Sequence, residues 1–186
     1  MCGIAGYISR ENKNNFKKKL TKMVHAVSHR GPDGKGFFYS NKFGFGHRRL
    51  SIIDLSENGI QPMHYHDSNL VIIHNGEIYN YIEIKKTLKN EGYIFKNNTD
   101  TEVILAAYHF WGFDCVNHFN GMWSFALYDK KKEIIFCSRD RFGVKPFYYT
   151  FNEDKFIFGS EIRQILPNLK KTKANRKVLI NYLFAN

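Results

Sequence analysis

Short apolar runs separated by tight turns are the feature that most limits how this 186-residue chain can fold. Residues 122–128 and 133–138 flank the turn at 129–132, and residues 147–150 and 155–158 flank the turn at 152–154. Strands joined so closely pair antiparallel, because parallel strands need a crossover of about a dozen residues or more. The chain also has 17 Phe and 11 Tyr, which favour strands. A sheet-rich core built from hairpins is therefore expected.

The remaining elements are grouped rather than strictly alternating. Strand-like runs are expected at 2–8, 36–40, 45–53 and 70–74, and one helix follows the first strand with its apolar residues between 16 and 27 on one face. Two helices at 78–91 and 101–111 stand together, the second capped by Thr99 or Asp100, and a last helix begins near Arg176. This order favours an α+β fold with antiparallel sheets over repeated βαβ units.

Charge and cysteine usage narrow the class of protein. The net charge is +11, but the lysine runs at 17–19, 130–132 and 170–171 lie far apart, and no nucleic-acid motif accompanies them. We expect no nucleic-acid partner. Three cysteines without CxxC or zinc spacing predict no metal site and suit a reducing cytoplasm. No apolar run is long enough to span a membrane, so we expect no membrane association and a cytoplasmic location.

Cys2 follows the initiator Met1 directly. A lone cysteine at this position is usually an ordinary residue. Removal of Met1 would, however, give Cys2 a free α-amine with a pKa of about 7.7 to 8.0 beside its thiol. Nucleophile and general base would then belong to one residue, and no histidine would be required.

Asn75 and Gly76 follow the apolar run at 70–74. Gly76 could simply make a turn. Alternatively, the Asn75 side-chain amide and the Gly76 backbone N–H could donate to one developing oxyanion. The sequence alone leaves both interpretations open.

The arginine pair Arg48-Arg49 and the carboxylate of Asp100 are candidates for binding a ligand. Arg48 and Arg49 lie on an expected strand and so point to opposite faces, which suggests one structural and one functional arginine. The functional one would be a fork for a carboxylate, although a solvated surface arginine is the alternative. Asp100 could cap a helix or hold an ammonium group.

A set of short motifs resembles, in order and over nearly the whole chain, the class II glutamine amidotransferase domain of glutamine-hydrolysing asparagine synthetases. They are Met-Cys-Gly-Ile-Ala-Gly at 1–6, His-Arg-Gly-Pro-Asp at 29–33, Arg-Leu-Ser-Ile-Ile-Asp at 49–54, Asn-Gly-Glu-Ile-Tyr-Asn at 75–80, Gly-Met-Trp-Ser-Phe-Ala-Leu-Tyr-Asp at 121–129, Arg-Asp-Arg-Phe-Gly-Val-Lys-Pro-Phe-Tyr-Tyr at 139–149 and Gly-Ser-Glu-Ile at 159–162.

The resemblance implies an N-terminal-nucleophile hydrolase fold, a four-layer αββα sandwich, and hydrolysis of L-glutamine to glutamate and ammonia. It assigns the following roles to residues of this chain: Cys2 as nucleophile with its α-amine as base, Asn75 and Gly76 as oxyanion hole, Arg49 as clamp on the α-carboxylate, Glu77 and Asp100 as further contacts to glutamine with Asp100 facing the α-ammonium, and Leu50, Ser51, Ile52 and Ile53 as lining along the strand of Arg49. Because Cys2 is present, a non-catalytic binding module on the same fold is disfavoured.

The family joins this domain to a larger one that uses ATP and magnesium, and the chain lacks its Ser-Gly-Gly-x-Asp-Ser pyrophosphate loop. We therefore expect an amidotransferase domain at 1–166 without a cofactor of its own, and the start of a connection at 167–186 that leaves Leu179, Leu183 and Phe184 partly uncovered. An ATP-dependent synthetase domain, in cis or in trans, is the expected partner, and a homodimer stays open. The acceptor is aspartate or another acid, such as a sugar acid, because the absent domain selects it.

Overall fold

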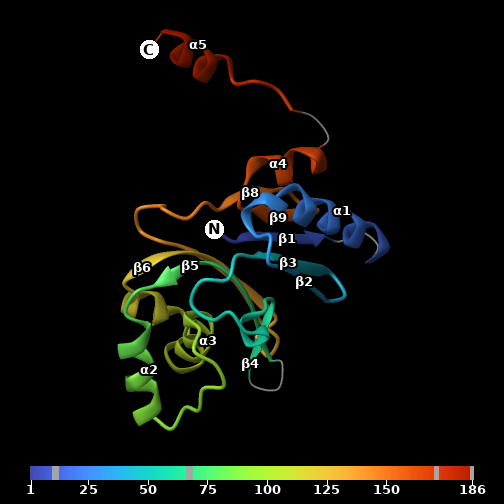
Figure 1. Ribbon diagram of the computed structural model, residues 1–186. Helices are drawn as coiled ribbons and strands as arrows, with labels where there is room; N and C mark the ends of the chain where they lie inside the picture. The colour runs from blue at the N-terminus through green and yellow to red at the C-terminus, as the bar shows by residue number, and fades with distance from the viewer. Residues whose placement is uncertain (10–12, 66–68, 170–171, 185–186) are drawn as a thin grey trace.

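Two antiparallel sheets lie face to face between two layers of helices in the computed structural model (Figure 1). The structure describes residues 1–9, 13–65, 69–169 and 172–184. Lys170 and Lys171, which form one of the lysine runs, lie outside the described residues. The arrangement confirms the expected α+β fold and its four-layer αββα order.

The first sheet contains the N-terminal strand at its centre, in the order β2-β3-β1-β9-β8. Its strands are β1 (Gly3–Ser9), β2 (Gly34–Tyr39), β3 (Phe43–Arg49), β8 (Tyr148–Phe151) and β9 (Lys155–Gly159). Helix α1 (Lys13–Ala26) covers the outer face. It can approach closely because Gly46 faces it: a Cβ at this position would lie 2.3 Å from the Val24 side chain.

The second sheet has the order β4-β5-β6-β7, with β4 (Met63–Tyr65), β5 (Leu70–Ile78), β6 (Gly121–Asp129) and β7 (Ile134–Arg139). Helices α2 (Tyr81–Asn90) and α3 (Asp100–Trp111) lie on its outer side. Residues 100–108 of α3 are all buried. The Thr99 hydroxyl caps α3 by accepting a hydrogen bond from the Glu102 N–H at 3.2 Å, so Thr99 rather than Asp100 is the cap.

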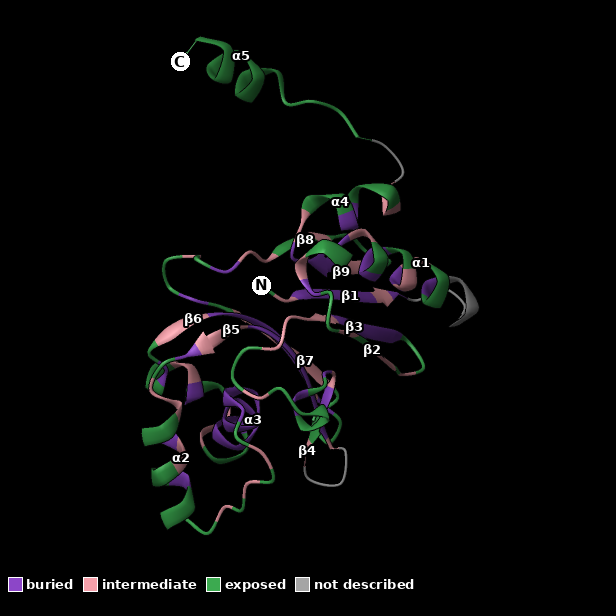
Figure 2. Ribbon diagram, in the orientation of Figure 1, coloured by how far each residue is buried: buried purple, intermediate pink, exposed green. Residues whose placement is uncertain are grey.

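An aromatic layer fills the space between the two sheets. Alternation along each strand directs Phe43 and Phe45 of β3 inward, and they meet Tyr128 and Phe158 there. The ring centroids of Phe43 and Tyr128 are 4.7 Å apart, and those of Phe45 and Phe158 are 6.0 Å apart. Figure 2 shows that most residues of β1 in the first sheet and of β5 in the second are buried. Packing of this layer therefore sets the separation of the sheets.

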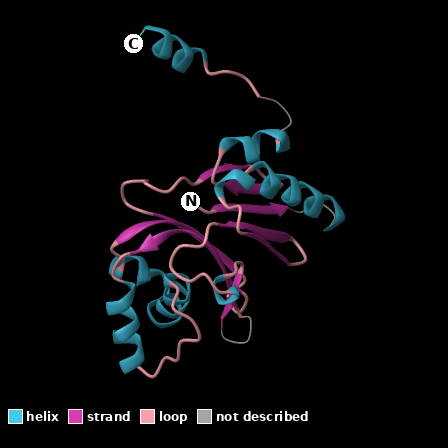
Figure 3. Ribbon diagram, in the orientation of Figure 1, coloured by secondary structure: helices cyan, strands magenta, loops and turns pink. Residues whose placement is uncertain are grey.

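Three expected boundaries are wrong by three residues or more. Figure 3 shows the helices, strands and loops as they lie in the structure. The strand expected at 45–53 ends at Arg49, because β1 and β2 offer partners only up to that point, so Leu50–Ile53 lie in a loop. The strand expected at 70–74 continues to Ile78, paired with β6. Consequently the helix expected from residue 78 begins at Tyr81.

The C-terminal part contains α4 (Ile162–Ile165) and α5 (Arg176–Phe184), and the short 3-10 helices of the chain are η1 (Ser28–Arg30), η2 (Glu57–Gly59), η3 (Gly112–His118) and η4 (Leu166–Asn168). Helix α5 stands apart from the sandwich and buries none of its side chains; Leu179, Leu183 and Phe184 are all exposed. Across the described residues, every helix is too short or too polar to cross a membrane.

Candidate active site

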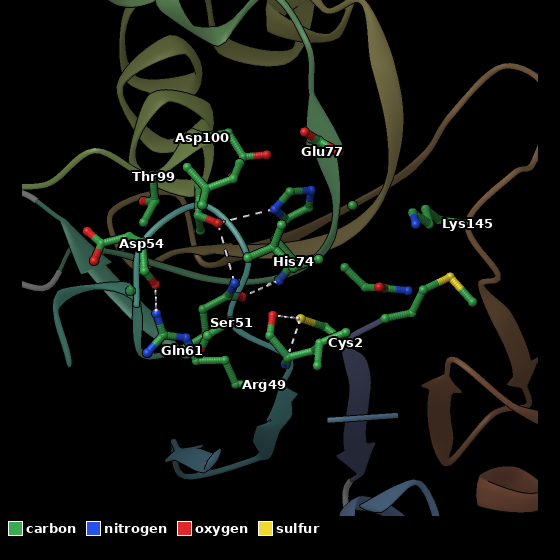
Figure 4. A pocket seen from close by; sticks show the side chains of 18 of the residues that line it. Cys2, Arg49, Ser51, Asp54, Gln61, His74, Glu77, Thr99, Asp100 and Lys145 are labelled. Atoms are coloured by element: carbon green, nitrogen blue, oxygen red, sulfur yellow. Dashed lines mark hydrogen bonds between the residues drawn. The ribbon is translucent and has the colours of Figure 1, made fainter. Parts of the chain in front are cut away.

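A cavity of about 100 Å³ lies where the ends of β1, β3 and β5 approach the first turn of α3. Figure 4 shows the side chains that line it. Every site residue expected from the sequence is among them: Cys2, Arg49, Leu50, Ser51, Ile52, Ile53, Asn75, Gly76, Glu77 and Asp100. Residues separated by almost 100 positions in the sequence thus line the same cavity.

Cys2 precedes β1 and lies beside the end of β3. Its Sγ accepts a hydrogen bond from the Leu50 N–H at 3.4 Å and lies 3.6 Å from the Leu50 carbonyl oxygen. The Arg30 Nε donates to the Cys2 carbonyl at 3.0 Å, which fixes the backbone of the thiol-bearing residue. Burial raises the pKa of the Cys2 thiol, an effect that the Leu50 N–H and Arg49 oppose in part. The sulfur is therefore a thiol at neutral pH and needs a base before it can attack.

Asn75 and Gly76 lie inside β5, so Gly76 does not make a turn there. Asn75 is 1% exposed, and its Nδ2 has no hydrogen-bond partner among the described residues. A buried amide donor without a partner is costly, and it is suited to an acceptor that arrives with a ligand. Gly76 packs tightly against β6, where a Cβ would lie 2.3 Å from the Met122 carbonyl oxygen.

Arg48 and Arg49 occupy opposite faces of β3. The Arg48 Nε donates to the Val24 carbonyl oxygen of α1 at 3.2 Å. Arg49 lines the cavity instead, and its guanidinium donates to the carbonyl oxygens of Ser56, at 2.7 Å, and Asp54. Arg49 therefore holds the loop that follows it while its side chain lies beside the cavity.

Two carboxylates face the cavity from the second sheet and its helix layer (Figure 4). Asp100 is 5% exposed, and its Oδ2 accepts a hydrogen bond from the Ile78 N–H at 2.9 Å. This hydrogen bond fixes the carboxylate at the wall of the cavity. Glu77 lies at the end of β5, beside the oxyanion-hole candidates.

Several residues that were not predicted from the sequence also line this cavity, namely Gln61, His74, Thr101 and Lys145. Lys145 is 6% exposed, and the Asp140 carboxylate holds its loop by accepting from the Val144 and Lys145 N–H groups at 2.8 and 2.9 Å. Lys145 stands within the motif at 139–149, which was the available signal. No sequence signal pointed to Gln61, His74 or Thr101, because packing between distant segments brings them to the cavity.

The antiparallel αββα sandwich holds the thiol of its second residue in a cavity at the ends of its strands. A solved structure of the glutamine phosphoribosylpyrophosphate amidotransferase from Bacillus subtilis has this fold, with a TM-score of 0.74 and 20% identity over 88% of this chain and 43% of that one. The chain belongs to the family of glutamine amidotransferase domains, whose model matches residues 1–186.

Curated relatives are similar over nearly the whole chain. A protein of Methanocaldococcus jannaschii that carries the name of a glutamine-hydrolysing asparagine synthetase is 49% identical, over 97% of this chain. Asparagine synthetase 3 of Bacillus subtilis is 42% identical, over 91% of this chain. The chain spans only 37% and 28% of the lengths of these two relatives.

Proposed function

We propose that Cys2 attacks the side-chain amide of L-glutamine and that this domain releases glutamate and ammonia. The observation that carries the proposal is that the half-buried Cys2 thiol and the buried Asn75 Nδ2, which has no hydrogen-bond partner among the described residues, line one cavity. The family supports a glutamine-directed reaction. The raised pKa of the Cys2 thiol supports the need for a base.

The proposed base is the α-amine of Cys2, freed when Met1 is removed. In the described structure Met1 is 55% exposed, which leaves the peptide bond after it near the surface. The amine takes the thiol proton as sulfur bonds to the amide carbon, and the carbonyl oxygen becomes an oxyanion. Asn75 Nδ2 and the Gly76 N–H donate to that oxyanion. Return of the proton to nitrogen breaks the C–N bond and releases ammonia, leaving a γ-glutamyl thioester that water hydrolyses.

Charge complementarity orients the amino-acid end of the substrate. Arg49 binds the α-carboxylate and Asp100 binds the α-ammonium, an assignment supported by the presence of both side chains in the lining of the cavity. Glu77 is a further contact. The loop residues Leu50, Ser51, Ile52 and Ile53 form the remaining wall, beside the sulfur.

The test is glutamate release from L-glutamine by protein whose N-terminus has been identified by intact mass. Chain that begins at Cys2 should hydrolyse glutamine, and Cys2→Ala should fall to the uncatalysed background. Activity should scale with the fraction that lacks Met1, because an amide nitrogen cannot act as a base. Equal rates for the parent and Cys2→Ala, or full activity with Met1 attached, would contradict the mechanism. Cys137→Ala is the matched control, since Cys137 does not line the cavity.

We further propose that the ammonia serves asparagine synthesis in the cytoplasm. An ATP- and magnesium-using synthetase domain, joined in cis or docked in trans, would activate aspartate; the names of the relatives and their greater lengths support this. We place the domain at 1–166 and the start of the connection at 167–186, a proposal supported by the exposure of α5. Residues 1–186 with aspartate, ATP, magnesium and glutamine should make asparagine only when such a domain is added.

A further inference from the structure

A chain of hydrogen bonds behind the cavity joins three separate segments. Gln61, in the loop before β4, reaches both His74 of β5 and Thr101 of α3. His74 in turn lies next to Asn75 in the sequence and 2.7 Å from the position that a Cβ on Gly76 would occupy, measured to its Nε2. Figure 4 shows the His74 ring on the side of the cavity that carries Asp100 and Glu77.

The donor and acceptor roles along this chain can be worked out one after another. The His74 backbone N–H can only donate, so the atom 2.6 Å from it is the amide oxygen of Gln61. The Gln61 Nε2 must then donate to the Thr101 hydroxyl oxygen at 3.3 Å. The hydroxyl proton is left to donate in turn. In the described part of the chain, the acceptor within its reach is His74 Nδ1, at 3.2 Å.

This order assigns the proton of a neutral His74 to Nε2. Burial lowers the pKa of His74, an effect that Asp100 opposes, so the ring is neutral near pH 7. The ring is 2% exposed, and Nε2 has no partner among the described residues although His74 lines the cavity. A buried N–H without an acceptor is costly, and the cost is relieved when a ligand supplies one.

We propose that His74 is a further ligand-binding residue of this site, whose Nε2–H is held by Gln61 and Thr101 as a fixed donor to an acceptor oxygen of the bound amino acid. The proposal rests on the proposed glutaminase function. Gln61 and Thr101 are positioning residues: they act through the imidazole by fixing which nitrogen carries the proton.

The direct test is the tautomer of His74 in protein carrying ¹⁵N-labelled imidazoles, assigned by comparison with His74→Phe. Using Cys2→Ala to prevent turnover, we expect the proton on Nε2 in the free protein and a shift of the Nε2 resonance when L-glutamine saturates the site. A proton on Nδ1, or an Nε2 resonance that L-glutamine leaves unmoved, would overturn the proposal. This measurement needs no turnover. If the parent protein proved inactive, the proposed glutaminase function would fail, and the His74 tautomer and its response to L-glutamine would still test the role of His74.

Matched variants separate positioning from a purely structural role. Thr101→Val removes the hydroxyl proton and should move part of the His74 population to the other tautomer, whereas Thr101→Ser should keep the parent tautomer. His74→Phe should raise KM about tenfold with little change in kcat, the size of one lost hydrogen bond, and His74→Gln should recover part of the loss. Equal KM values for His74→Phe and His74→Gln, or identical imidazole spectra for Thr101→Val and Thr101→Ser, would contradict the proposed roles of His74 and Thr101.

Discussion

The two walls of the cavity are built differently. Asn75 and Gly76 belong to the middle of a paired strand, with β6 alongside, and the Asn75 side chain is 1% exposed. The opposite wall, residues 50–61, is mostly loop, and its Ile52 side chain is 69% exposed. A donor set in a sheet is fixed before a ligand arrives, whereas a loop can adjust around one. The difference predicts where substitutions will affect the rate and where they will affect binding.

The largest effect is expected from Asn75→Ala in the strand wall. Loss of one oxyanion donor should raise the barrier by about 2.7 to 4 kcal/mol, seen in kcat for glutamine hydrolysis. Stability should hold or rise slightly, because Nδ2 has no hydrogen-bond partner among the described residues. Ser124→Ala is the control: Ser124 faces Asn75 across the ladder and is equally buried, but does not line the cavity. A rate loss of equal size in both variants would show that packing, not the amide, matters.

Arg49 ends β3 directly before the loop wall and holds that loop from beside the cavity, so its replacement tests binding. Arg49→Lys should lower kcat/KM by a factor that corresponds to about 2 kcal/mol, mainly through a higher KM. A lysine ammonium cannot form a bidentate contact with a carboxylate, and it would lose the hydrogen bonds to the loop carbonyl oxygens. Arg48→Lys is matched in chemistry but faces α1, and should change kcat/KM little. Similar losses of kcat/KM in the two variants would contradict the assignment of the Arg49 face of β3 to the substrate.

Gly76→Ala asks how rigid the strand wall is. The new methyl group would lie 2.3 Å from the Met122 carbonyl oxygen and 2.6 Å from the Trp123 Cα, so β5 and β6 must move apart. We expect a loss of about 1 to 3 kcal/mol in the free energy of unfolding by urea denaturation. Gly34→Ala is the control, because its nearest contact would be 3.8 Å away. Unchanged stability of Gly76→Ala would mean that this wall adjusts as the loop does.

The smallest effect belongs to the loop wall. Ile52→Ala removes an exposed side chain, so the free energy of unfolding should change by no more than about 0.5 kcal/mol. Any effect on glutamine hydrolysis should appear in KM rather than kcat. A fall in kcat as large as that of Asn75→Ala would contradict the division between the walls.

Much of this division could not be predicted from the sequence. The hairpins around residues 129–132 and 152–154 were predictable because their turns and flanking strands are local. The run Leu50-Ser51-Ile52-Ile53 looks like a strand, but within the described part of the chain the pairing of β3 with β1 and β2 ends at Arg48 and Arg49. Conversely, polar Asn75 and Glu77 look like the end of a strand, yet β6 pairs with both. Pairing between distant segments decided each case.

The site residues show the same limit. Cys2, Arg49 and Asn75 stand within the sequence motifs, and the resemblance that those motifs carry added Asp100; the structure brings all four to one cavity. His74 had no such pattern. Its orientation depends on Gln61 and Thr101, which approach it from a loop and a helix.

The aromatic layer between the sheets has a bearing on chemistry as well as on folding. Cys2 and Arg49 are carried by the first sheet, Asn75 and Gly76 by the second, and side chains such as Phe45 and Phe158 lie between the two. The layer is thus a spacer whose thickness sets the gap between sulfur and amide donors. Misalignment of about 1 Å in a reacting pair can cost a hundredfold in rate. Replacing an aromatic ring of this layer, even far from the cavity, is therefore expected to change the distance between the Cys2 sulfur and the Asn75 amide, and with it the rate.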